Sequence, residues 1–124
     1  MVLKMIFASA LLVASLASGA QDARYATPAD KRAACQSMFG AATEAKAMLR
    51  RTSSQDDALR VAQIVVNDYR AGKLGYGLGT DAKALDNIHS IALTAWSDLI
   101  EPPPNPIQSF FTPEFLADCL KNAG

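Results

Sequence analysis

Residue types that hold metals or transfer protons are scarce in this sequence. Its 124 residues include one histidine and two cysteines. A structural zinc site needs several Cys or His ligands, so this composition argues against one. The neighbouring carboxylates Asp56 and Asp57 lack the alternating oxygen ligands of a calcium loop, and no turn motif marks a nucleophile. We therefore expect no metal and no cofactor, and we expect that the protein is not an enzyme.

Long runs of one charge are also absent. The chain has 12 basic and 12 acidic residues, and the two kinds are interspersed along it. Recognition of nucleic acid usually needs a clustered basic face, and the pair Arg50 and Arg51 is too small to form one. The sequence therefore predicts no nucleic-acid partner.

Long apolar stretches without charge are absent except near the N-terminus. Residues 5–17 carry no ionisable group and follow the single positive charge of Lys4. Ser18 and Ala20 then occupy the −3 and −1 positions of a cut before Gln21, an order typical of a secretory signal peptide. The apolar run is shorter than the about 20 residues that a membrane-spanning helix needs, so an uncleaved anchor is the less favoured alternative. No cysteine lies near the cut, which argues against a lipoprotein anchor.

Cleavage at this point would separate a signal peptide, residues 1–20, from a single helical domain, residues 21–124. The mature chain would have 104 residues with 11 basic and 12 acidic side chains, because only Lys4 is lost among the charged residues. That length is ordinary for one small domain. We expect a periplasmic or secreted protein without stable membrane insertion after cleavage.

Both cysteines, Cys35 and Cys119, fall within the part expected to be exported, where oxidation is favoured. An even number of cysteines in a short exported chain predicts a disulfide, here between positions 84 residues apart. In the chain-entropy model, closing so long a loop stabilises a fold by roughly 4 kcal/mol, within a range of about 0 to 5. Two free thiols or an intermolecular bridge are the alternatives.

Four segments begin with signals that are typical of helix N-termini. Thr27 and Thr112 are each followed by a proline and, within three residues, by an acidic side chain that favours the positive end of a helix. Ser53 or Ser54 is the expected cap of the second helix. Thr80 is the expected cap of the third.

Behind each cap, apolar residues recur at spacings of three and four, which predicts one buried face per helix. The expected faces comprise Cys35, Met38, Ala42, Ala45 and Leu49; Ala58, Val61, Ala62, Val65 and Tyr69; Leu85, Ile88, Ala92, Ala95 and Leu99; and Phe115, Leu116, Cys119 and Leu120. A strand over 61–66 competes with the second helix because its residues are largely β-branched. Prolines in 101–106 end the third helix. The sequence thus predicts an all-α fold, a small bundle or orthogonal array of about four helices closed by one disulfide.

Residues 72–80, GKLGYGLGT, place four glycines between the second and third helices. They match neither the dinucleotide fingerprint nor the phosphate-binding P-loop, and the fingerprint follows a strand rather than a helix. We expect a turn that covers the core, in which Gly72 ends the helix in the left-handed conformation. An anion held at the helix N-terminus near Thr80 is the alternative. Tyr76, at the tip, is a candidate contact for a partner.

Two further groups of residues are candidates, and one of them, the segment 107–111, is the foremost candidate for a contact surface. His89, the only histidine, lies three residues after Asp86, so the two share a helix face and could act as an acid–base pair. A surface imidazole beside a solvated carboxylate is the favoured interpretation. Phe110 and Phe111, between the prolines and the last helix, are expected in the core, but they become candidate partner contacts where they remain exposed.

Small size, expected export and the lack of a catalytic constellation favour a protein that acts by binding. In general plan, the chain resembles the small helical, two-cysteine periplasmic immunity proteins that neutralise cell-wall amidase toxins in Gram-negative bacteria. The resemblance covers Cys35 to Cys119 without a diagnostic motif, so it transfers no functional residue. It implies an inhibitor or immunity-type role toward another periplasmic protein. The alternatives are an envelope stress or structural protein without a dedicated ligand, and a small hydrolase or lyase that uses His89 and Asp86.

Overall fold

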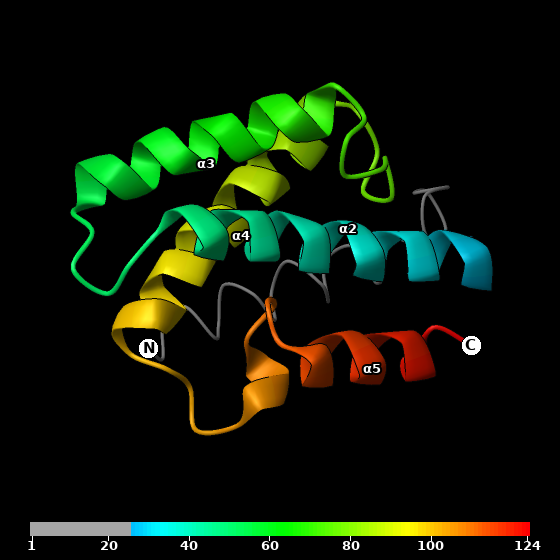
Figure 1. The fold of residues 1–124 in the computed structure, drawn as a ribbon. Coiled ribbons are helices and arrows are strands. Elements are labelled where there is room, and N and C mark those ends of the chain that lie inside the picture. Colours follow the sequence, from blue (N-terminus) through cyan, green and yellow to red (C-terminus); the bar gives the residue numbers. More distant parts are fainter. Residues whose placement is uncertain (1–25) are drawn as a thin grey trace.

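The structure is a computed structural model that describes residues 26–124, which form four α-helices, a short 3₁₀ helix and no strand (Figure 1). The predicted all-α fold is thereby confirmed. None of these helices is long and apolar enough to cross a membrane. The predicted signal peptide, residues 1–20, lies outside the described residues. In chain order the elements are α2 (Pro28–Met48), α3 (Gln55–Arg70), α4 (Ala82–Ile100), η2 (Pro106–Gln108) and α5 (Pro113–Asn122).

Helix α2 is the centre of the arrangement and contacts each of the other three α-helices. Helices α3 and α5 flank it on opposite sides, and both run antiparallel to it (Figure 1). Helix α4 crosses behind α2 and packs against α3 as well. The fold therefore has one layer of three roughly aligned helices and a fourth helix that crosses them.

Three of the four predicted helix caps are confirmed by side-chain hydrogen bonds. The hydroxyl of Thr27 accepts from the N–H of Asp30, and the hydroxyl of Ser54 accepts from the N–H of Asp57. In both cases the aspartate reaches back to the N–H of the cap residue, which completes a capping box. The hydroxyl of Thr112 caps α5 by accepting from the N–H of Phe115. This cap is not a capping box, because residue 115 is a phenylalanine, which cannot accept from the N–H of Thr112.

The predicted cap of the third helix at Thr80 is wrong by one residue. Helix α4 begins after Asp81, whose Oδ1 accepts a hydrogen bond from the N–H of Ala84 at 3.0 Å. A carboxylate is a stronger acceptor than a hydroxyl, and its charge also favours the positive end of the helix. These two effects explain why Asp81 and not Thr80 takes the cap position.

The predicted apolar faces of α2 and α3 are confirmed, because all of their residues are buried. The predicted face of α4 is buried at its centre, while Leu85 and Leu99 are half-buried. In the predicted face of α5 only Phe115 is buried, and Leu116, Cys119 and Leu120 are half-buried. Many of the fully buried residues are alanines, which let the helix backbones approach closely. These alanines are Ala41, Ala42, Ala45, Ala62, Ala84 and Ala95.

The competing strand over 61–66 is wrong, since these residues lie inside α3. Val61 and Val65 fall four residues apart on the buried face of the helix, and each is at most 1% exposed. The burial of these side chains outweighs the small loss of helix propensity that β-branching causes.

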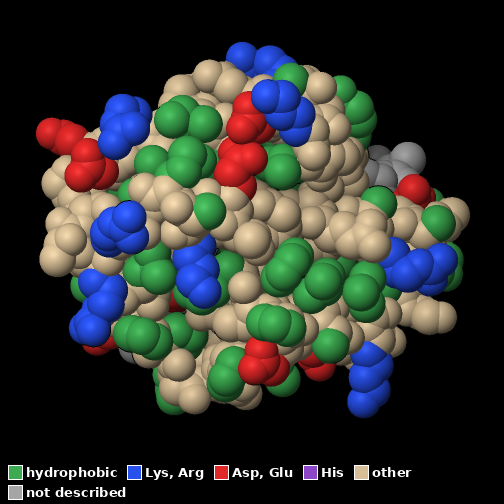
Figure 2. Space-filling model, viewed as in Figure 1, with side chains coloured by type: hydrophobic (Ala, Val, Ile, Leu, Met, Phe, Trp, Pro, Cys, Tyr) green, Lys and Arg blue, Asp and Glu red, His purple; other side chains and the backbone are tan. Residues whose placement is uncertain are grey.

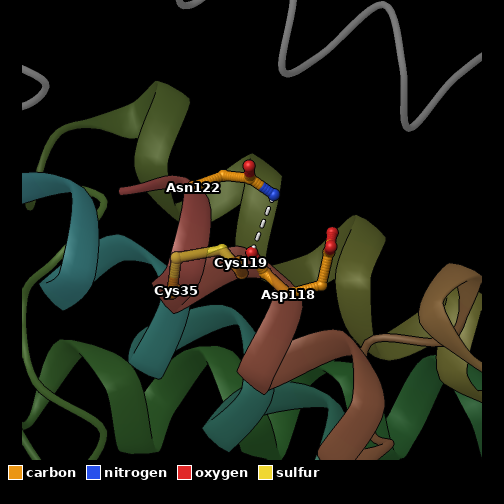
Figure 3. Close-up of a disulfide and its surroundings, with 4 residues drawn as sticks. All are labelled: Cys35, Asp118, Cys119 and Asn122. Carbon is orange, nitrogen blue, oxygen red and sulfur yellow. Dashed lines mark hydrogen bonds between the residues drawn. A yellow bond between two sulfur atoms is a disulfide. The ribbon is translucent and has the colours of Figure 1, made fainter. Parts of the chain in front are cut away.

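The predicted disulfide between Cys35 of α2 and Cys119 of α5 is confirmed (Figure 3). The S–S distance is 2.02 Å and the Cα–Cα distance is 5.8 Å, within the range that a disulfide requires. Beside it, the side-chain amide of Asn122 donates to the backbone oxygen of Asp118 at 2.9 Å (Figure 3). Within α5 only Phe115 is buried. The disulfide therefore supplies much of the attachment of this short helix.

Candidate functional site

Residues 72–80, which connect α3 to α4, are named the glycine loop. Backbone hydrogen bonds at the end of α3 fix the direction in which this loop leaves the helix. Gly72 has a φ of +86°, which confirms the predicted left-handed conformation. Its N–H donates to the backbone oxygen of Tyr69 at 2.9 Å, and the N–H of Lys73 donates to that of Asp68 at 3.0 Å. The two bonds together form a Schellman motif, which sets the direction in which the loop leaves the helix.

A buried serine of α2 holds the middle of the glycine loop. Ser37 is 1% exposed. Its Oγ donates to the backbone oxygen of Leu74 and accepts from the N–H of Gly77, both at 3.1 Å. The loop thus satisfies the buried hydroxyl, and the hydroxyl satisfies two backbone groups of the loop.

The phenol of Tyr69, at the end of α3, holds the last part of the glycine loop. This side chain is fully buried. Its hydroxyl donates to the backbone oxygen of Gly79 at 2.5 Å and accepts from the N–H of Leu78 at 3.1 Å. Leu78 is buried in the core cluster as well. Ser37 and Tyr69 therefore tie four loop residues to two different helices.

One glycine of the loop is required by close packing. A Cβ at Gly77 would lie 2.1 Å from the backbone oxygen of Ala33 and 2.5 Å from the backbone nitrogen of Ala34, both in α2. Side-chain carbons do not approach the backbone so closely, so only glycine lets the loop rest directly on α2.

The hydrogen bonds of the loop favour a turn over the alternative anion site. The N–H of Gly75 donates to Gly72, and that of Gly79 donates to Tyr76. These bonds use donors that an anion would need. At the N-terminus of α4 the carboxylate of Asp81 already takes the place of an anion, and its charge would repel a second one.

Tyr76, at 53%, is the most exposed large hydrophobic side chain among the described residues. Its ring stands edge-on to that of Tyr69, with centroids 6.1 Å apart and an interplanar angle of 73°. Its hydroxyl folds back over Gly72, 2.4 Å from the position that a Cβ there would take. The glycine loop thus supports one part of the ring and leaves the rest to solvent.

The other two candidate contacts lie away from the glycine loop, in the turn between η2 and α5 (Figure 1). Phe110 is 6% exposed and packs edge-on against Phe115, with centroids 4.9 Å apart. Phe111 is half-buried, and the Nζ of Lys46 lies 4.7 Å from its ring centroid. The structure therefore does not bring these residues together with Tyr76, and Phe110 offers a partner little surface.

His89 and Asp86 both belong to α4. Asp86 is exposed and His89 is half-buried, and no hydrogen bond or ion pair joins them in the part of the chain that the structure describes. Within residues 26–124, no group of three or more His, Cys, Asp or Glu side chains could hold a metal ion.

A pair of carboxyl groups lies at the contact between α2 and α3, beside the start of the glycine loop. The pair consists of Glu44 of α2 and Asp68 of α3. The Nζ of Lys73 lies 3.5 Å from Oδ1 of Asp68. Burial, and after it the neighbouring Asp68, raises the pKa of Glu44 from 4.5 to about 7.

The direction of this shift sets its effect on stability. Because the folded protein binds the proton of Glu44 more tightly than the unfolded chain does, the stabilisation is fully present below about pH 4.5. This stabilisation is lost as the pH rises from 4.5 to about 7. Above that pH, the effect of Glu44 on the free energy of unfolding no longer changes.

Ser37, Gly77 and Glu44 were not predicted as functional residues from the sequence. Ser37 interrupts the apolar face of α2 next to Met38, and a polar residue in such a place signals a buried hydrogen bond. That signal does not identify the partner, because Leu74 and Gly77 are 37 and 40 residues away. No neighbouring residue in the sequence indicates that Gly77 packs closely on α2 or that Glu44 lies near Asp68.

No protein family model matches the chain, and no curated protein or solved structure is similar to it. The resemblance to periplasmic immunity proteins therefore stays a prediction from the small helical plan with two cysteines. Any functional proposal depends on the contacts of the chain itself, above all those of the glycine loop.

Proposed function

We propose that the protein acts by binding another protein, in an inhibitor or immunity-type role, and that the glycine loop with Tyr76 forms the contact. The observation that carries this proposal is a half-exposed aromatic ring on a loop that two buried hydroxyl groups hold in place. A loop that is ordered before binding loses little conformational entropy in the complex. Tyrosine is also among the residues that most often dominate binding energies at protein interfaces.

The surroundings of the loop support a protein partner rather than a substrate or a nucleic acid. On the face shown in Figure 2, basic and acidic side chains are interspersed with hydrophobic ones, and neither charge forms a broad area of its own. Nucleic-acid binding would need such an area of positive charge. No hydrogen bond or ion pair among the described residues joins Asp86 to His89, so the structure gives no support to the alternative of a small hydrolase or lyase.

We also propose that residues 1–20 are removed on export to the periplasm or beyond. The Cys35–Cys119 disulfide supports this, because such bonds persist in oxidising compartments. When the full chain is expressed in a Gram-negative host, intact-mass measurement of the periplasmic fraction should find a product that begins at Gln21 and lacks two thiol protons. Full-length protein that remains in the cytoplasmic fraction with both thiols free would contradict export.

Replacing Tyr76 with alanine should weaken the contact with a partner by about thirtyfold or more, because truncation of a dominant aromatic residue costs about 2 kcal/mol or more. The measurement is photo-crosslinking: a crosslinking amino acid at position 73, an exposed site in the same loop that leaves Tyr76 in place, should give a discrete adduct in an envelope extract of the source cells. Unlabelled protein should suppress that adduct, and the Tyr76→Ala variant should do so only at about thirtyfold higher concentration.

Leu59 of α3 offers a matched control, because its side chain is 41% exposed and lies at the opposite end of that helix from the loop. A Leu59→Ala variant should suppress the adduct as well as the wild type does. Equal suppression by the Tyr76→Ala variant, or an adduct that forms equally from position 59, would show that the loop is not the contact.

A further inference from the structure

The connection between α4 and η2, residues 101–106, is an exposed feature that the proposed function does not use. This proline segment holds four of the six prolines of the chain. Only Pro103 is half-buried within it, and its other residues are exposed. The glycine loop precedes α4 and the proline segment follows it, so the 19 residues of this helix separate the two by about 28 Å (Figure 1). The proline segment is therefore a second, separate surface.

The prolines themselves fix the conformation of this segment. A proline ring holds its own φ at about −65°, and a residue that precedes a proline is restricted to extended conformations. Pro102 and Pro103 meet both conditions, and no peptide bond among the described residues is cis. Glu101 and Asn105, which also precede prolines, have ψ angles of 86° and 121°. The middle of the segment is thus a polyproline II helix, which has three residues per turn.

Hydrogen bonds hold both ends of the proline segment. The N–H of Glu101 donates to the backbone oxygen of Ser97 in the last turn of α4 at 2.9 Å. At the other end, Oδ1 of Asn105 accepts from the N–H of Ile107 at 3.1 Å. A segment that is ordered in this way before it binds loses little conformational entropy in a complex.

The exposed side of the segment offers apolar rings and free hydrogen-bond acceptors. Successive residues of a polyproline II helix lie on three different edges, and the half-buried Pro103 occupies the edge that faces the molecule. Pro102 and Pro104 therefore occupy the two outer edges. Within residues 26–124, the backbone oxygens of residues 101–104 accept no hydrogen bond. Both outer edges are thus available to a partner.

This combination matches one class of protein surface. Grooves lined by aromatic side chains recognise polyproline II segments, because proline rings pack on the aromatic faces. The indole N–H of Trp and the hydroxyl of Tyr can also donate to free backbone oxygens. Glu101 is exposed and forms no ion pair among the described residues, so a basic side chain complements that end of the segment. Ile107, at 39% exposed, extends the apolar surface at the other end.

We propose that the proline segment is a docking site for another protein, which binds it in a groove lined by Trp or Tyr side chains with a basic residue opposite Glu101. The rings of Pro102 and Pro104 pack on the aromatic side chains, and the free backbone oxygens accept from their polar groups. Because the segment lies away from Tyr76, this contact and the glycine-loop contact succeed or fail independently.

The experiment is photo-crosslinking from position 100 of the full chain. Ile100 ends α4 beside the segment, and its side chain is 42% exposed. In an envelope extract of the source cells, we expect a discrete adduct that unlabelled protein suppresses. Mass spectrometry of the digested adduct should place the crosslink beside Trp or Tyr residues of a different protein. The absence of an adduct, or an adduct with a second copy of this chain, would overturn the proposal.

Full-chain variants used as competitors assign the contact to the prolines. The double variant Pro102→Ala, Pro104→Ala removes both outer rings and frees the backbone, so it should suppress the adduct only at about tenfold or higher concentration. Pro113→Ala makes the same change at an exposed proline of α5 and should compete as well as the wild type. Both variants should keep the wild-type circular dichroism. Equal competition by the double variant and this control would overturn the proposal.

A charge reversal tests the basic residue of the groove. Glu101→Lys should also compete poorly, and its deficit should shrink at high salt because an exposed charge pair is screened there. Competition by Glu101→Lys equal to that of the wild type at low salt would show that no basic residue faces this position.

Discussion

Replacing both cysteines, Cys35→Ala together with Cys119→Ala, should lower the free energy of unfolding by about 2 to 5 kcal/mol. The bond closes a loop of 84 residues, so its removal greatly enlarges the freedom of the unfolded chain. Alanine avoids leaving an unpaired hydroxyl at Cys35, which is buried. Denaturant unfolding followed by circular dichroism measures the change.

The loss should be concentrated in α5, because Phe115 is its only buried helix residue and α2 is the one α-helix it packs on closely. Amides of α5 should therefore lose protection from exchange first, while those of α3 and α4 keep theirs. Reduction of the wild-type protein provides the matched control and should give the same loss. A change below about 0.5 kcal/mol in both experiments would show that α5 is held by its packing alone.

Replacing Gly77 with alanine should lower the free energy of unfolding by about 2 to 6 kcal/mol. The added carbon would meet the backbone of Ala33 at 2.1 Å, so the loop must move off α2. Overpacking of this kind costs about 1 to 3 kcal/mol. The movement also breaks the hydrogen bonds of Ser37, and a buried hydroxyl without partners costs about 1 to 3 kcal/mol more.

Gly40→Ala is the matched control, because it makes the same chemical change on the helix that the loop contacts. A Cβ at Gly40 would lie 3.7 Å from a methyl group of Leu74, an ordinary packing distance. Glycine inside a helix is less favourable than alanine by about 0.8 to 1 kcal/mol. Gly40→Ala should therefore stabilise the protein, while Gly77→Ala destabilises it. Equal effects of the two substitutions would contradict the close approach of the loop.

The Gly77→Ala variant also connects stability to the proposed function. Once the loop leaves α2, Tyr76 loses the support of Gly72 and of the Tyr69 ring. The variant should then compete for a partner as poorly as Tyr76→Ala does, even under conditions where most of it is folded. If a folded Gly77→Ala variant competed as well as the wild type, the partner would not bind through the glycine loop.

Much of the fold could be predicted because its signals are local. Thr27, Ser54 and Thr112 are recognisable as caps from residues within three positions of them, and the apolar spacing identifies the buried faces of α2 and α3. The disulfide followed from there being only two cysteines in the chain. The one wrong cap, Thr80, arose where two acceptors stand side by side and the carboxylate of Asp81 is the stronger.

The candidate site could be predicted only in outline. The glycine content of residues 72–80 indicated a turn and Tyr76 indicated its tip, but the anchors of the loop depend on the packing of helices. The bonds from Ser37 span 37 and 40 residues. The pairing of Glu44 with Asp68 likewise depends on how α2 and α3 meet, which neither sequence segment specifies.

The most direct test of the account is amide hydrogen exchange at Gly77 and Leu78 in the free protein. Their acceptors are the hydroxyl groups of Ser37 and Tyr69, both of which are buried. If the glycine loop is held in place before any partner binds, both amides should exchange about a thousandfold or more slowly than in an unstructured peptide. Exchange within about tenfold of the unstructured rate would show that the loop opens freely, and it would contradict an ordered platform for Tyr76.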